Sequence, residues 1–142
     1  MLVKLIIAFA LLSLQQSTNA EYASLVVTIN KVESGRGKLI VALFNDEEQF
    51  LKSDYINKQL SVTDNGEHVV TFNDLPKGIY AVSVIHDENG NGELDKNLIG
   101  IPTEKFGFSN NKMGRFGPPS FEECGIDLNE NKEIAIDLKK ML

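Results

Sequence analysis

The run from Ile79 to His86 constrains the fold of this chain more than any other stretch. Its apolar, mostly β-branched residues predict a strand, and alternate side chains of a strand point to the same face. The larger apolar set shares one face, which we assign to the core. The members of that face are Tyr80, Val82, Val84 and His86. No long amphipathic helix accompanies this strand, so parallel β-α-β crossovers are not expected.

Six further segments have the composition of strands. They cover residues 25–32, 38–45, 59–63, 68–72, 125–128 and 133–138. Turn residues predict three hairpins, around Gly35–Gly37, Asn65-Gly66 and Asn129–Lys132, and Asp46 is expected to cap a short helical turn. About seven short strands with such turn signals predict an all-β fold, a single Greek-key β-sandwich.

The segment from Asp87 to Glu123 loses the strand periodicity. It holds six of the eleven Gly, three of the four Pro and four of the eight Phe. A disordered linker would not be so aromatic, so we expect one long ordered loop that folds over an end of the sandwich. Either the loop has a functional role, or it is an insertion that only plugs the core. Cys124, the single cysteine, is predicted to be a small buried residue.

Residues 1–20 resemble an export signal. Lys4 precedes an apolar run from Leu5 to Leu12, and Thr18-Asn19-Ala20 ends the segment as a plausible cleavage site. The alternative is an uncleaved anchor. The mature domain would be residues 21–142, located in the periplasm or secreted. Loss of Lys4 moves the formal charge from −6 to −7, which disfavours nucleic acid as a partner. No further stretch is long enough for an integral membrane segment.

Directly after the strand, the chain reads D-x-N-x-N-G-x-x-D. Oxygen side chains at alternate positions, followed by Gly92, are typical of a loop that wraps around calcium. Position 12 is Leu98 instead of a bidentate Glu, so the loop is not an EF-hand, and binding at about 10⁻⁴–10⁻³ M is expected. The same residues also favour turns that need no metal. The predicted ligands are Asp87, Asn89, Asn91, the backbone carbonyl of Glu93, Asp95 and, from later in the loop, Glu104.

The glycine-rich and aromatic part of the loop indicates a binding surface for a protein, a peptide or a carbohydrate. The alternative is that the rings face inward, which we expect for at least two of the four. The candidate surface residues are His86, Phe106, Phe108, Asn110, Phe116 and Phe121.

Two chemical alternatives remain open. A zinc site could combine His68 and His86 with a nearby carboxylate, although no spaced histidine pair is present. A hydrolase could be assembled at the same loop from His86, Asp87 and Ser109 or Ser120, but the sequence lacks a nucleophile motif. We therefore assign no catalytic residue.

Four motifs between residues 75 and 121 together resemble the bacterial domain-of-unknown-function family 2141. The resemblance implies a secreted or periplasmic β-sandwich of immunoglobulin-like or transthyretin-like type, and it implies no established activity. We expect an exported, non-enzymatic binding or structural module. The motifs are Leu75-Pro76-x-Gly78-x-Tyr80-Ala81-Val82, His86-Asp87-x-Asn89-x-Asn91-Gly92-x-Leu94-Asp95, Gly100-Ile101-Pro102-x-Glu104-x-Phe106-Gly107-Phe108-Ser109-Asn110 and Phe116-Gly117-Pro118-Pro119-x-Phe121.

Overall fold

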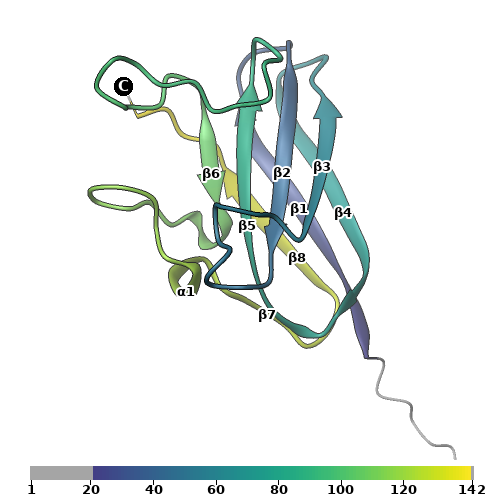
Figure 1. Cartoon of the computed structure of the whole chain (residues 1–142). Helices are drawn as coiled ribbons and strands as arrows, with labels where there is room; N and C mark the ends of the chain where they lie inside the picture. Colours follow the sequence, from purple (N-terminus) through teal and green to yellow (C-terminus); the bar gives the residue numbers. More distant parts are fainter. Residues whose placement is uncertain (1–20, 142) are drawn as a thin grey trace, which may run out of the picture.

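The structure is a computed structural model that describes residues 21–141, so the predicted export signal lies outside the described residues. Two β-sheets are stacked face to face (Figure 1). The all-β sandwich prediction is confirmed. The strands are β1 (Tyr22–Val32), β2 (Lys38–Phe44), β3 (Ile56–Ser61), β4 (Gly66–Pro76), β5 (Gly78–Asp87), β6 (Phe106–Phe108), β7 (Ile126–Leu128) and β8 (Lys132–Asp137), with a 3-10 turn η1 (Ser109–Asn111) and a short helix α1 (Phe121–Cys124).

The smaller sheet has the order β4-β1-β8, and the larger has the order β3-β2-β5-β6, with β7 also paired to β5. Most neighbours are antiparallel, whereas β1 and β8 are parallel. The short strand β6 comes from within the long loop, which raises the strand count above the expected seven. The loop is therefore an integral part of the larger sheet.

The three predicted hairpins are wrong. β1 and β2, β3 and β4, and β7 and β8 follow one another in sequence, but the members of each pair lie in different sheets. Each connection therefore carries the chain across the sandwich. Gly and Asn allow the chain to reverse, but they do not decide between a neighbour in the same sheet and one in the facing sheet. Strands with an apolar face gain more burial here by facing each other across the core.

The turn predicted after Asp46 is present, but it does not extend into a regular helix. The Asp46 carboxylate does accept a hydrogen bond from the Glu48 backbone N–H at 2.8 Å, as a cap would. The following residues form successive turns instead, and the N–H groups of Lys52 and Ser53 both donate to the Gln49 carbonyl. These turns bring Phe50 to the outer face of the larger sheet.

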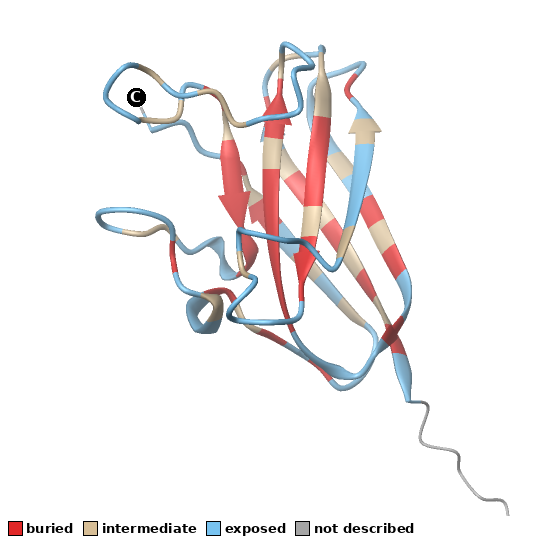
Figure 2. Ribbon diagram, viewed as in Figure 1, coloured by how far each residue is buried: buried red, intermediate tan, exposed pale blue. Residues whose placement is uncertain are grey.

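The main core lies between the sheets and follows the strand alternation (Figure 2). Leu25, Val27 and Ile29 of β1 are fully buried, as their shared face predicted. The β5 face is also confirmed, because its four residues are at most 2% exposed. The Tyr80 hydroxyl donates to the Pro76 carbonyl oxygen at 2.6 Å, which ties the start of β5 to the preceding turn.

A second apolar cluster, which we call the outer cluster, covers the other face of β5. The Phe50 ring has edge contacts with Phe44 and Phe121, at centroid distances of 5.2 and 5.8 Å. Cys124 is fully buried there, as predicted. Burial raises the pKa of its thiol from 9.0 to about 11, so the thiol is neutral. The outer cluster consists of Ala81, Phe106, Phe108 and Cys124, with Phe50, Leu94, Met113 and Phe121 packed against them.

Candidate functional site

The loop that follows β5 is organised by one carboxylate. Asp87 is fully buried, and its Oδ1 accepts hydrogen bonds from the backbone N–H groups of Gly90 (2.9 Å) and Asn91 (3.1 Å). Its Oδ2 accepts a hydrogen bond from the Gly92 N–H at 2.8 Å. The β1–β2 turn packs tightly against the start of this loop. Only a glycine fits at position 37 of the turn, because a Cβ atom there would lie 2.2 Å from the Asp87 carbonyl oxygen. The sequence thus folds the loop around the side chain of its first residue.

A second carboxylate, Asp95, closes the loop. It accepts hydrogen bonds from the side-chain amides of Asn89 and Asn91, the latter at 2.6 Å. The amide oxygens of the same two residues accept backbone N–H groups two positions further along, from Asn91 at 3.1 Å and from Glu93 at 2.9 Å. These are Asx-turns, the alternative that the composition of this stretch left open.

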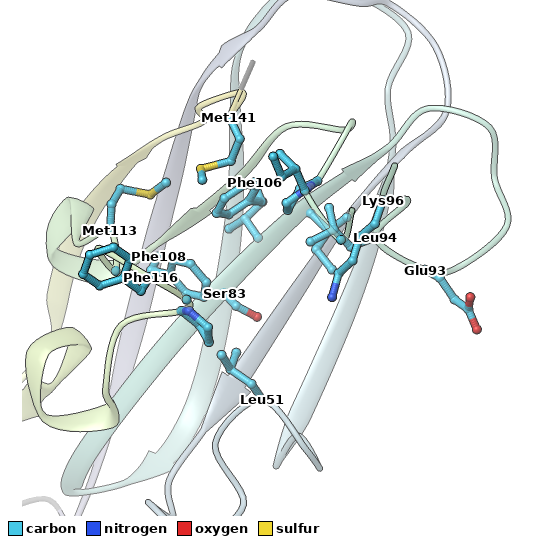
Figure 3. A pocket seen from close by; sticks show the side chains of 18 of the residues that line it. Leu51, Ser83, Glu93, Leu94, Lys96, Phe106, Phe108, Met113, Phe116 and Met141 are labelled. Carbon is cyan, nitrogen blue, oxygen red and sulfur yellow. The ribbon is translucent and has the colours of Figure 1, made fainter. Parts of the chain in front are cut away.

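Glu104 reaches back from the later part of the loop and is 7% exposed. Its two oxygens accept the backbone N–H groups of Glu88 (3.0 Å) and Asp95 (3.1 Å), so it clamps both ends of the loop. These hydrogen bonds tie the two ends of the loop together. The Glu93 side chain points away from the cleft that opens beside this loop (Figure 3), but the prediction concerned its backbone carbonyl.

The side-chain oxygens of Asp87, Asn89, Asn91, Asp95 and Glu104 already accept hydrogen bonds. Within residues 21–141, no three His, Cys, Asp or Glu side chains are grouped closely enough to hold a metal ion. A calcium ion would need the side-chain amides of Asn89 and Asn91 to turn, so that oxygen instead of nitrogen faces Asp95. That rotation would give up two Asx-turn hydrogen bonds in exchange for ion coordination.

The histidines and serines do not form the alternative sites. His86 lies in the core with Nε2 at 2.9 Å from the Arg36 carbonyl oxygen, whereas His68 lies on β4 in the other sheet. The buried Ser109 hydroxyl donates to the Cys124 carbonyl at 2.6 Å, and the Ser120 hydroxyl caps α1. His86, Ser109 and Ser120 therefore each have a structural contact, and Nε2 of His68 lies 3.3 Å from a carboxylate oxygen of Asp64.

A cleft of about 1040 Å³ opens beside this loop, over the outer cluster. Its walls are the loop after β5 and the loop after η1, which extend from the same side of the sandwich (Figure 1). Phe106 and Phe108 lie at its base, and Met113 and Met141 approach from two sides (Figure 3). This volume is slightly above the range of about 300–1,000 Å³ that is usual for small-molecule sites.

Exposed apolar residues gather around the cleft. Five of the nine large apolar side chains that are exposed in the described residues lie in its lining or in the turn between two lining residues, Lys96 and Gly100. Phe116 is 99% exposed at the tip of a tight turn, where a side chain at Gly114 would meet the Gly117 carbonyl oxygen. The five residues are Leu51, Leu98, Ile99, Phe116 and Met141.

The predicted surface residues have different positions. Phe106 and Phe108 are mostly buried at the base of the cleft, Phe116 is at its rim, and Phe121 is half-buried in the outer cluster. Asn110 does not line the cleft. Its side-chain amide donates to the carbonyls of Glu123 and Gly125, with a φ of 61°.

Sequence reasoning missed most of the cleft lining. Met113 and Met141 lie outside any recognisable motif, and Leu51 was assigned to a helical turn. One feature of the sequence could have indicated the cleft. Leu98-Ile99 is an apolar pair within a turn that ends at a glycine, and exposed apolar residues that cluster often mark a binding surface.

The lining carries a positive charge. Lys52, Lys96 and Arg115 line the cleft, together with a single carboxylate among the described residues, Glu93. Lys52 donates to the Glu48 carbonyl at 3.0 Å. The ion pairs found within residues 21–141 do not involve Lys96 or Arg115. These two cations are therefore available to a ligand.

These features define a small all-β sandwich with a long loop that builds a cleft on one outer face. The chain belongs to the bacterial domain-of-unknown-function family 2141, described as an uncharacterized protein conserved in bacteria, whose model matches residues 27–136. No curated protein and no solved structure matches the chain. Nowhere in residues 21–141 is there a helix with the length and apolarity to cross a membrane.

Proposed function

We propose that this chain is a non-enzymatic binding module that acts in the periplasm or outside the cell, and that the cleft is its binding site. The observation that carries the proposal is the concentration of exposed apolar side chains there. Single exposed apolar residues are common, but a cluster around a concave site indicates a ligand or a partner. The predicted export signal in residues 1–20 supports the location.

A neutral apolar dye such as Nile red tests the cleft. Dye emission should rise with the purified protein and fall by most of its amplitude in M113S/M141S, which makes two walls of the cleft polar. The control is I79S, because Ile79 is 48% exposed and lies on β5 outside the cleft lining. Equal emission from both variants, or none from the wild type, would contradict the proposal.

Calcium binding by the loop between Asp87 and Glu104 is a second part of the proposal. It is supported by the spacing of the oxygen side chains and by the clamp that Glu104 forms across the loop. Occupancy would fix one wall of the cleft. With a dissociation constant of about 1 mM, 10 mM calcium would stabilise the fold by about 1.4 kcal/mol.

A calorimetric melt in 10 mM calcium and in chelator measures this effect. We expect a midpoint higher by several degrees in calcium, and no shift in D95A/N91A. Magnesium at the same concentration is the control for ionic strength. Identical melts in calcium and chelator would remove calcium from the proposal and leave the cleft in place.

The hydrolase alternative has no comparable support. In the part of the chain that the structure describes, the cleft lining pairs no carboxylate with a histidine or a free nucleophile. The polar groups of the loop itself are engaged in its own hydrogen bonds. The geometry therefore favours binding over catalysis.

A further inference from the structure

The cleft combines an apolar base with unpaired positive charge, in a protein that is acidic overall. The whole chain has 20 Asp and Glu against 14 Lys and Arg, yet three cations and one carboxylate line the cleft. The carboxylate is Glu93, and its side chain points away from the cavity (Figure 3). The site therefore attracts anions, although the surface as a whole repels them.

The apolar part suits a flexible chain. Phe106 and Phe108 are 5.8 Å apart, with their ring planes inclined at 72°, and they provide aromatic surface at the base. Met113 and Met141 line the sides, and unbranched thioether side chains adapt to the shape of what they contact. Leu94 and Ile101 add aliphatic surface from the loop after β5.

A peptide that extends the sheet does not fit this site. The free side of β6 already pairs with the C-terminal segment, where the Phe106 N–H donates to the Lys139 carbonyl at 3.0 Å. The Lys139 N–H in turn donates to the Phe106 carbonyl at 2.9 Å. No backbone donor or acceptor of Phe106 remains for strand addition.

We propose that the cleft binds a small single-chain amphipathic carboxylate, with its hydrocarbon chain on the Phe106 and Phe108 rings and its head group at Lys96 and Arg115. This inference rests on the proposed function, because it names the ligand class of the same cleft. A carboxylate beside a cation gains charge-assisted hydrogen bonds, and the chain gains apolar burial. An anion alone would leave the apolar residues of the lining without a role, and a neutral apolar ligand would leave the cations without one.

Calorimetric titration with three twelve-carbon amphiphiles below their micelle concentrations tests the charge preference. Dodecanoate should bind at least about tenfold more tightly than dodecyl maltoside or dodecyltrimethylammonium. K96A/R115A should weaken the binding of dodecanoate by about tenfold or more and leave the affinity for dodecyl maltoside unchanged. The control is K77A, because Lys77 is an exposed cation in the β4–β5 turn.

The outcomes separate the inference from the function on which it rests. Equal binding of all three amphiphiles, or equal losses in K96A/R115A and K77A, would overturn the anion assignment and keep the cleft as a binding site. If none of the three binds and Nile red emission also fails to rise, both proposals fail.

A membrane surface is the remaining competitor, because Leu98, Ile99 and Phe116 project beside the cleft. Co-sedimentation with anionic phosphatidylglycerol vesicles addresses it directly. Binding to vesicles without binding of free dodecanoate would overturn the proposal in favour of a membrane-docking surface.

Discussion

The two sides of β5 are buried by different means. The side that faces the other sheet packs against strands, and its apolar residues alternate with outward-facing ones. The other side is covered by the outer cluster, whose residues come from turns, from β6 and from α1. The strands bury the apolar side chains of their side almost fully, whereas the loops leave a cleft of about 1040 Å³ over theirs. The sandwich therefore supplies most of the buried core, and the loops build the cleft.

The largest expected effect is in the inter-sheet core. Leu43→Ala removes a fully buried side chain and should cost about 2–5 kcal/mol in the free energy of unfolding. Phe121→Ala should cost less, about 1–2 kcal/mol, because that ring is only half-buried in the outer cluster. Urea unfolding measures both, and Val69→Ala, which removes a half-exposed side chain, is the control. Equal costs for Leu43→Ala and Phe121→Ala would break the comparison.

The next effect concerns the loop that forms one wall of the cleft. Asp87→Ala removes the acceptor of three backbone N–H groups and should destabilise the protein by about 2–3 kcal/mol. Asp127→Ala is a matched control, because that carboxylate is exposed on β7. Hydrogen exchange should show faster exchange of the Gly90 and Gly92 amides in the fully folded variant. Unchanged protection there would mean that the carboxylate does not hold the loop.

The two sides of β5 also differ in how far the sequence predicts them. The sequence correctly identified the faces of β1 and β5 that meet in the core. Burial has a period of two in β1, whereas β5 is buried on both faces. Turn residues such as Asn65-Gly66 did not reveal which sheet the next strand joins. That choice depends on contacts between strands far apart in the sequence, which no local motif encodes.

The residues of the candidate site also differ in how far the sequence predicts them. Asp87 and Asn91 were recognisable because their spacing acts within one short loop. The contacts of Met113 and Met141 with the cleft were not, because they arise from the packing of separate segments against β5 and β6. A cleft built from such segments has no sequence period to detect.

A smaller effect is expected at α1, which supports the outer cluster. The Ser120 hydroxyl accepts the Glu123 N–H, and Glu123 Oε2 accepts the Ser120 N–H at 2.8 Å, so the two residues form a capping box. Ser120→Ala should cost about 1 kcal/mol in urea unfolding, against almost nothing for the exposed Ser53→Ala. A cost equal to that of Ser53→Ala would show that the cap does not stabilise this side.

The capping box also predicts an acid dependence. The hydrogen bond from the Ser120 backbone, together with that from its hydroxyl, lowers the pKa of Glu123 below its usual 4.5. The contribution is therefore complete above pH 4.5 and is lost as the pH falls through the lower pKa of the folded state. Glu123→Gln should show a weaker loss of stability below pH 4.5 than the wild type. Parallel urea midpoints for the two proteins across this range would contradict the assignment.

A last effect is expected from the thiol at the centre of the outer cluster. Because burial raises the Cys124 pKa from 9.0 to about 11, the unfolded chain loses this proton at a lower pH than the folded one. Stability should therefore fall as the pH rises from 9 to 11, and Cys124→Ala should remove that part of the slope. Alkylation by iodoacetamide at pH 8 should be slow in the native protein and fast in urea. Rapid native alkylation would show that loops pack this side too loosely to exclude solvent, and the contrast between the two sides of β5 would then extend beyond the cleft.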